Sequence, residues 1–306
     1  MKVFVAGATG VVGRRAVRLL VGAGHDVSAV ARSAARQALL RDLGAHPVTV
    51  DLFDRTAVDR AVVGHDAVCN MATHIPASAR MAMPRAWAEN DRIRSEVSAN
   101  LVQAVLAHDV GRYVQESITF LYADGGDRWL DESSPVEPVA NLRSATVAEA
   151  NAARVTGTGA TGVVLRFAAF YGPDSDSTLG MIAMAKRGLA MAAGPDGYTS
   201  SVTTDDAAAA VVAALAVPPG TYNVGDDEPL TRREFFAALA TALGVRPPRI
   251  APAGLAKFGG AKAAALTRSQ RVANRRFVAA SGWAPASPSV RQGWAAVVAA
   301  ADTAGA

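Results

Sequence analysis

The stretch "KVFVAGATGVVG", residues 2–13, decides the fold. Its apolar start predicts a short buried strand, and the glycines that follow are spaced three apart at Gly7, Gly10 and Gly13. Gly7 permits a tight turn, Gly10 lets the backbone approach a pyrophosphate, and Gly13 lets the next helix pack closely on the sheet. N–H groups at the start of that helix can hold the anion. This strand–turn–helix predicts a dinucleotide site that comprises Gly7, Thr9, Gly10, Val11, Val12 and Gly13.

The end of the second predicted strand, "AVARSAAR" at residues 29–36, indicates which dinucleotide binds. An acidic residue here would bind the 2′-hydroxyl of the adenosine ribose, whereas a basic residue favours a 2′-phosphate. The chain has Arg32 at this point, with Arg36 one helical turn later and no carboxylate between them. We therefore expect NADP rather than NAD, with a solvated surface arginine as the alternative interpretation of Arg32.

Short β-rich runs alternate with amphipathic stretches as far as residue 117, and they include one long predicted helix from about Ala86 to His108. Such alternation implies right-handed crossovers between parallel strands. We expect an α/β fold, a Rossmann-type doubly wound parallel sheet with a smaller C-terminal substrate lobe. Residues 1–172 plus 201–224 should form the NADP-binding domain, and residues 173–200 plus 225–306 the smaller lobe.

The composition narrows the class of protein. Cys69 is the only cysteine of 306 residues, which favours a reducing compartment and a buried, inert thiol. The apolar run 207–217 is shorter than the roughly 20 residues of a membrane span, and no signal-peptide pattern follows Met1. The net charge of +4 comes without a nucleic-acid-binding motif. We expect a cytoplasmic protein that binds neither membranes nor nucleic acid. The basic cluster near the C-terminus is solvated charge or anchors a small anion, and it comprises Arg268, Arg271, Arg275 and Arg276.

These features resemble the extended short-chain dehydrogenase/reductase superfamily of NAD(P)-dependent epimerases and dehydratases. The similar motifs are "GATGVVG", "VDLFD", "NMAT", "SANLVQAV", "LRFAAFYGP", "TTDDAAAA", "TYNVGD" and "SGWAP". The resemblance implies a small-molecule substrate, anionic if the arginines anchor it, and it favours a dimer through helices near residues 90–108 and 141–155. It also implies a loop beside the adenine, a segment beside the cofactor ribose and an active-site Asn, formed by Asp51, Leu52, Met71, Ala72, Thr73 and Asn100.

The catalytic motif of that superfamily has no counterpart here. Its enzymes use a Tyr, a Lys four residues later and a Ser or Thr, and the similar segment of this chain is "NLRSATVAE", residues 141–149. Asn141 then stands at the Tyr position, Ala145 at the Lys and Ile118 at the Ser or Thr, and none of these side chains transfers protons. None of the five tyrosines is followed by a Lys at that spacing. The usual acid/base has been replaced or abandoned.

Four other residues are candidates for proton transfer: Glu116, Ser117, Thr119 and His74. Glu116 lies within a predicted buried strand, where a carboxylate is costly unless it is paired. It is either a tuned acid/base or a structural residue bound to backbone amides or to an arginine such as Arg166. Ser117 and Thr119 flank Ile118, and His74 follows the segment beside the cofactor. The pattern of His and Cys residues suggests no metal site.

Three functions remain open from the sequence. The leading one is an NAD(P)-dependent reductase, epimerase or dehydratase with an unusual proton relay, acting on a small polar substrate such as a sugar nucleotide or a secondary metabolite. The second is a catalytically degenerate protein that senses NADP(H), which the missing motif supports. The third is an isomerase or lyase that retains its cofactor without net redox change.

Overall fold

A single parallel sheet organises the protein. The computed structural model describes residues 1–76, 83–157, 159–256 and 267–304. The seven strands lie in the order β12-β7-β5-β4-β1-β2-β3, and every neighbouring pair is parallel. Their bounds are β1 (Lys2–Ala6), β2 (Asp26–Val30), β3 (His46–Val48), β4 (Ala67–Asn70), β5 (Arg112–Ile118), β7 (Thr161–Phe167) and β12 (Gly220–Val224). The predicted doubly wound sheet is confirmed, and the strand order reverses between β1 and β4, where open α/β sheets bind ligands.

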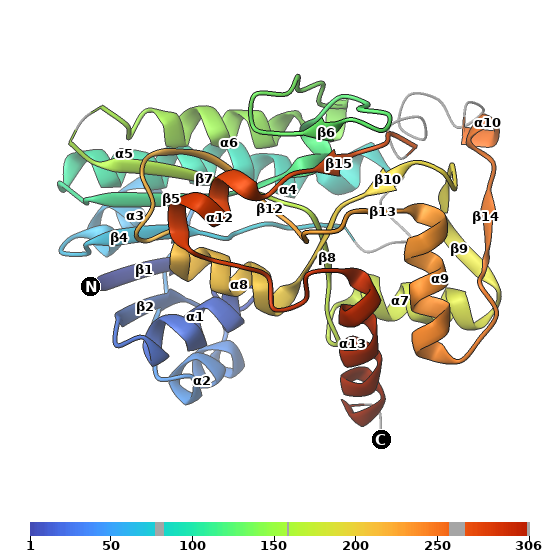
Figure 1. The fold of residues 1–306 in the computed structure, drawn as a ribbon. Coiled ribbons are helices and arrows are strands. Elements are labelled where there is room, and N and C mark those ends of the chain that lie inside the picture. Colours follow the sequence, from blue (N-terminus) through green and yellow to red (C-terminus); the bar gives the residue numbers. More distant parts are fainter. Residues whose placement is uncertain (77–82, 158, 257–266, 305–306) are drawn as a thin grey trace.

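Helices cover both faces of this sheet (Figure 1). Because successive side chains of a strand point to opposite faces, Val3 and Val5 join one apolar cluster, whereas Phe4 and Ala6 join the other. The first cluster packs against α1 (Gly13–Gly22), α2 (Ala34–Asp42), α8 (Thr204–Ala213) and α12 (Arg275–Ser281). The second packs against α3 (Arg55–Val62), α5 (Ser98–Ala107) and α6 (Arg143–Ala153).

The long helix expected from Ala86 to His108 is not uniform. It consists of a 3₁₀ turn η2 (Pro84–Trp87), α4 (Ala88–Arg92), a π-helical turn η3 (Ile93–Val97) and α5. The hydroxyls of Ser95 and Ser98 donate to main-chain carbonyls one turn back, which competes with regular α-helical bonding. The π turn carries Arg94 into the interior, where the side chain is 1% exposed. π turns of this kind frequently mark functional sites.

A separate apolar cluster forms outside the sheet around Trp294, Phe235 and Tyr171. It is built mainly by α7 (Asp176–Lys186), α9 (Arg232–Leu243) and α13 (Val290–Ala304), which lie at one end of the molecule (Figure 1). Short elements complete the chain: η4 (Thr119–Leu121), β6 (Trp129–Leu130), η5 (Ala140–Leu142), β8 (Ala169–Tyr171), β9 (Leu189–Ala193), β10 (Tyr198–Thr199), β11 (Ser201–Thr203), β13 (Leu230–Thr231), β14 (Arg249–Ala251), α10 (Ala253–Ala256) and β15 (Arg271–Val272). None of the helices in the described ranges is long and apolar enough to cross a membrane.

Candidate functional site

The glycine-rich turn has the tight geometry that its sequence predicts. Gly7 has a left-handed φ of +75°, and a Cβ there would lie 2.3 Å from the main chain of Met71. A Cβ on Gly13 would lie 2.1 Å from the carbonyl oxygen of Gly7, so the helix and the turn meet backbone to backbone. Helix α1 starts after Val12 with no side-chain cap and no acidic residue in its first turn. The turn therefore fits an anionic group such as a pyrophosphate.

The other predicted cofactor residues follow the same edge of the sheet. Arg32 is exposed just after β2, and Asp51 and Leu52 lie between β3 and α3. After β4, Met71 and Ala72 are buried, whereas Thr73 is exposed. The side-chain amide of Asn100 donates to the carbonyls of Leu52 and Phe53 at 3.0 and 3.3 Å. Asn100 thus holds the loop expected beside the adenine.

The segment similar to the catalytic motif forms the start of α6 and the turn before it. Asn141 is half-buried in η5, and Ala145 is completely buried in α6. The hydroxyl of Ser144 donates to Oδ1 of Asp91 at 2.7 Å, which ties the first turn of α6 to α4. Neither Asn141 nor Ala145 supplies a group that transfers protons near neutral pH.

One turn further along α6, Glu149 takes part in a buried polar network. Ser117 donates to Oε1 of Glu149 at 2.6 Å, and Arg166 on β7 binds both oxygens of the same carboxylate at 2.8 and 2.7 Å. Arg166 also donates to the hydroxyl of Tyr122, which donates to Oδ1 of Asn223 at 2.8 Å. The proton of Ser117 is directed at Glu149, so the network fixes the end of β5 against α6.

The pKa values of Arg166 and Tyr122 in this network are both raised. Burial favours a lower pKa for Arg166, but the hydrogen bonds and charge of Glu149 offset it and leave that pKa raised. Burial raises the pKa of Tyr122, and the opposing effect of Arg166 is smaller. Glu149 is not among the site residues predicted from the sequence. The sequence feature that could have revealed Glu149 is an arginine, Arg166, inside a predicted buried strand, together with an acidic residue in the segment that forms α6.

Glu116 pairs with Arg94 and not with Arg166, the arginine predicted as its partner if Glu116 has a structural role. Nη2 of Arg94 donates to Oε1 of Glu116 at 2.7 Å, and the two side chains are 1% and 7% exposed. Oε2 of Glu116 and two guanidinium nitrogens of Arg94 have no partner within the described chain. Nδ2 of Asn90, four residues before Arg94, is likewise buried and unsatisfied. Arg94 and Glu116 thus form a buried pair with spare hydrogen-bonding capacity, and Asn90 lies one helical turn before Arg94.

The remaining candidates occupy contrasting environments. The side chain of His74 is 54% exposed, with Nε2 at 3.7 Å from Oε2 of Glu89. Thr119 is buried at the end of β5, where it lines a pocket. Cys69 is fully buried, and burial raises the pKa of its thiol to about 12, so the prediction of an inert thiol agrees with its surroundings. The described residues contain no cluster of metal-binding side chains.

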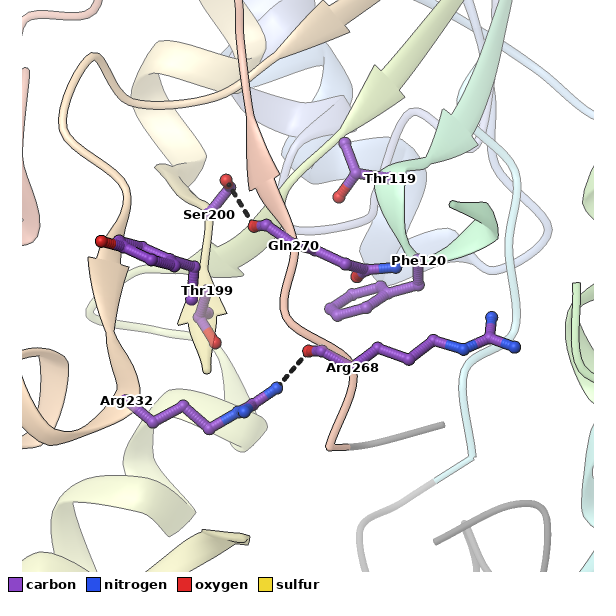
Figure 2. Close-up of a pocket in the computed structure, with 8 residues that line it drawn as sticks. Thr119, Phe120, Thr199, Ser200, Arg232, Arg268 and Gln270 are labelled. Atoms are coloured by element: carbon purple, nitrogen blue, oxygen red, sulfur yellow. Dashed lines mark hydrogen bonds between the residues drawn. The ribbon is translucent and has the colours of Figure 1, made fainter. Parts of the chain in front are cut away.

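The pocket beyond β5 has a volume of about 70 Å³. Figure 2 shows Thr119 and Phe120 on one side, with Arg232 reaching toward the main chain of Arg268. The full lining is Thr119, Phe120, Tyr198, Thr199, Ser200, Arg232, Arg268 and Gln270. It therefore joins the end of a sheet strand to residues of the predicted smaller lobe.

Comparisons with known proteins agree with this architecture. A model described as the NAD dependent epimerase/dehydratase family matches residues 3–225. A Streptomyces protein named 3-diazoavenalumate denitrifying reductase is 36% identical over 307 residues, which cover 96% of this chain and 99% of that protein. The 2-alkyl-3-oxoalkanoate reductase of Stenotrophomonas maltophilia (strain K279a) is 30% identical over 274 residues, 82% of this chain and 77% of that protein.

The fold is also found among solved structures. The UDP-glucose 4-epimerase of Thermus thermophilus, in complex with NAD, superposes with a TM-score of 0.79 at 24% identity, covering 99% of this chain and 100% of that one. The glycine turn, the parallel sheet and the family match lead to one assignment. The chain belongs to the NAD dependent epimerase/dehydratase family.

Proposed function

We propose that this protein is an NADPH-dependent reductase that replaces the diazo group of an arenediazonium carboxylate with hydrogen. The relative that is 36% identical over nearly the whole of both chains is named a denitrifying reductase of a diazo carboxylate. We choose aryl rather than alkyl diazonium ions because alkyl ones lose nitrogen too quickly to need an enzyme. The observation that carries the proposal is the chemistry missing from α6, where Asn141 and Ala145 stand in place of a proton donor and its lysine.

This reaction needs no proton donor. The nicotinamide supplies a hydride, the carbon–nitrogen bond breaks and N₂ leaves, so that ArN₂⁺ + NADPH gives ArH + N₂ + NADP⁺. Hydride can reach the carbon directly, or reach the terminal nitrogen to give an aryldiazene that then loses N₂. In both routes atoms and charge balance without an external acid. The roles left to the protein are to bind the two reactants, orient them and exclude water.

The groups near the end of β5 fit that limited role. The hydroxyl of Tyr122 is buried and bonded to Asn223, and the hydroxyl proton of Ser117 points to Glu149. His74 lies on the surface beside Glu89. A carbonyl reduction would instead leave an alkoxide that must be protonated. The relative named as a 3-oxoalkanoate reductase keeps ketone reduction as the second candidate function.

For the cofactor we propose NADP(H) rather than NAD(H). Arg32 is exposed at the end of β2, and residues 31–36 contain no acidic side chain. Its guanidinium can pair with a 2′-phosphate, and no neighbouring carboxylate in the sequence repels that phosphate.

The test is turnover of 3-diazonio-cinnamate with NADPH, measured as absorbance loss at the nicotinamide band together with N₂ release and arene formation. We expect one N₂ and one arene for each NADPH oxidised, at a rate well above a control without protein. Deuterium from C4 of labelled NADPH should appear in the arene if hydride reaches carbon directly. Oxidation of NADPH by a 3-oxoalkanoate but not by the diazonium compound would refute the proposal in favour of ketone reduction. Tight NADPH binding without turnover of either compound would favour the sensor hypothesis.

A further inference from the structure

Arg232 is a buried cation that lines the pocket beyond β5 and has no carboxylate partner in the described part of the chain. It is 7% exposed at the first position of α9. Nη1 donates to the carbonyls of Gly194 and Thr267 at 3.0 and 3.3 Å, and Nη2 donates to the carbonyl of Arg268. Among the described residues no acidic side chain forms an ion pair with it. The hydrogen bonds of its guanidinium within the described chain all go to main-chain carbonyls.

Asp124 is the acidic residue whose charge acts on Arg232, but it forms no ion pair with it. Burial lowers the pKa of Arg232, and the opposing influence comes from Asp124. Oδ1 of Asp124 already accepts from the main-chain N–H groups of Gly126 and Ser269. A buried charge without a counter-ion is costly, so an anion that enters the pocket gains a strong interaction there.

The backbone around Arg232 is shaped to hold the guanidinium in one place. A Cβ on Gly197 would lie 2.2 Å from Nη1, so the guanidinium in this position packs directly against the backbone of Gly197. The main-chain N–H of Arg232 donates to the carbonyl of Gly197 at 2.9 Å. Tyr198, the next residue, lines the pocket and pairs across the β10–β13 ladder with Thr231.

The second arginine of the pocket has a different role. Nη1 of Arg268 donates to the carbonyls of Tyr122 and Glu137, and Nη2 lies 3.2 Å from Oε2 of Glu137. Figure 2 shows its guanidinium directed away from Arg232. Arg268 is thus paired, which leaves Arg232 as the unpaired cation of the pocket.

We propose that Arg232 binds the carboxylate of an aryl carboxylate substrate, with the ring against Phe120 and Tyr198. The pocket volume of about 70 Å³ is several times the roughly 10–15 Å³ that a cavity needs to hold one water, so a carboxylate fits beside Arg232 and the ring extends toward Thr119 and the end of β5. The inference rests on the proposed function for the identity of the substrate, but the binding of an aryl carboxylate can be measured without it.

The experiment is calorimetric titration of the NADP⁺-loaded protein with cinnamate and with cinnamyl alcohol, neither of which has a diazo group. We expect cinnamate to bind at least 10-fold more tightly than the alcohol. Arg232→Met should weaken cinnamate binding by about 10- to 100-fold, the effect of losing a hydrogen-bonded charge, and leave alcohol binding unchanged. Arg232→Lys should retain part of the preference. Arg233→Met is the matched control, because the neighbouring Arg233 is exposed and pairs with Asp196.

Three results would overturn the inference: equal binding of the two ligands, no binding of either, or full cinnamate affinity in a folded Arg232→Met protein. If Arg232→Met does not fold, the affinities of the unmodified protein and of Arg232→Lys for cinnamate and cinnamyl alcohol still test the inference. Cinnamate binding that depends on Arg232, without turnover of any diazonium compound, would refute the proposed reaction and leave the carboxylate site standing. Turnover of a diazonium compound, without cinnamate binding that depends on Arg232, would refute the carboxylate site and leave the proposed reaction standing.

Discussion

Replacing Arg94 with methionine should destabilise the protein strongly. The 2.7 Å bond to Glu116 joins side chains that are 1% and 7% exposed, so the substitution leaves a carboxylate buried without a cation. Removing one partner of such a pair costs about 3–5 kcal/mol. At about 2 °C per kcal/mol for a chain of this length, the melting temperature should fall by about 6–10 °C. Glu116→Leu should act in the same direction, because it leaves the guanidinium without its counter-ion.

The double variant Arg94→Met/Glu116→Leu separates pairing from packing. Replacing a buried ion pair with apolar side chains is often neutral or stabilising, so we expect the double variant to lie within about 1 kcal/mol of the unmodified protein. Urea unfolding of all four proteins measures the coupling. Arg92→Met is the control, because Arg92 forms an exposed pair with Glu96 on the same stretch of helix, and its loss should leave stability unchanged. A loss below about 1 kcal/mol in Arg94→Met, or additive losses in the double variant, would refute the reasoning.

Two further predictions concern Asp226 and Arg32. Burial raises the pKa of Asp226 to about 8 from an ordinary value of 3.8, so between these values the folded protein binds a proton that the unfolded chain has released. The free energy of unfolding should therefore fall as pH rises from about 4 to about 8. Asp226→Asn should reduce that fall, as measured by urea unfolding at pH 5 and pH 8. Identical pH dependence in both proteins would contradict this. Arg32→Asp should reverse the preference from NADPH to NADH in binding titrations, because it adds repulsion of the 2′-phosphate and a partner for the 2′-hydroxyl. Tighter binding of NADH by the unmodified protein would show that Arg32 is only a surface charge.

The sheet could be predicted from the sequence because each of its determinants is local. The glycine spacing of residues 7–13 and the alternation of apolar runs with amphipathic stretches depend only on neighbours along the chain. The same holds for the burial of Cys69, which lies in an apolar run that forms β4. These predictions needed no knowledge of which distant segments meet.

The polar partners could not be predicted because they depend on how distant elements meet. Arg94 resembles a solvated helix charge in the sequence, and only the π turn directs it toward Glu116. A regular helix pattern gives no sign of that change in register. Arg232 similarly looks like surface charge until the loop of Gly194–Gly197 folds over it.

The complete burial of Ala145 limits which side chains this position accepts. Helix α6 contacts β5, β7 and the π turn, and hydrogen bonds hold it on both sides of Ala145, between Ser144 and Asp91 and between Glu149 and Ser117. A lysine introduced at this position would have to push a closely packed helix away from its neighbours. Substituting Asn141 and Ala145 with the tyrosine and lysine of the similar motif therefore meets a steric barrier in α6. Any route to that chemistry in this chain has to change the residues around the helix as well.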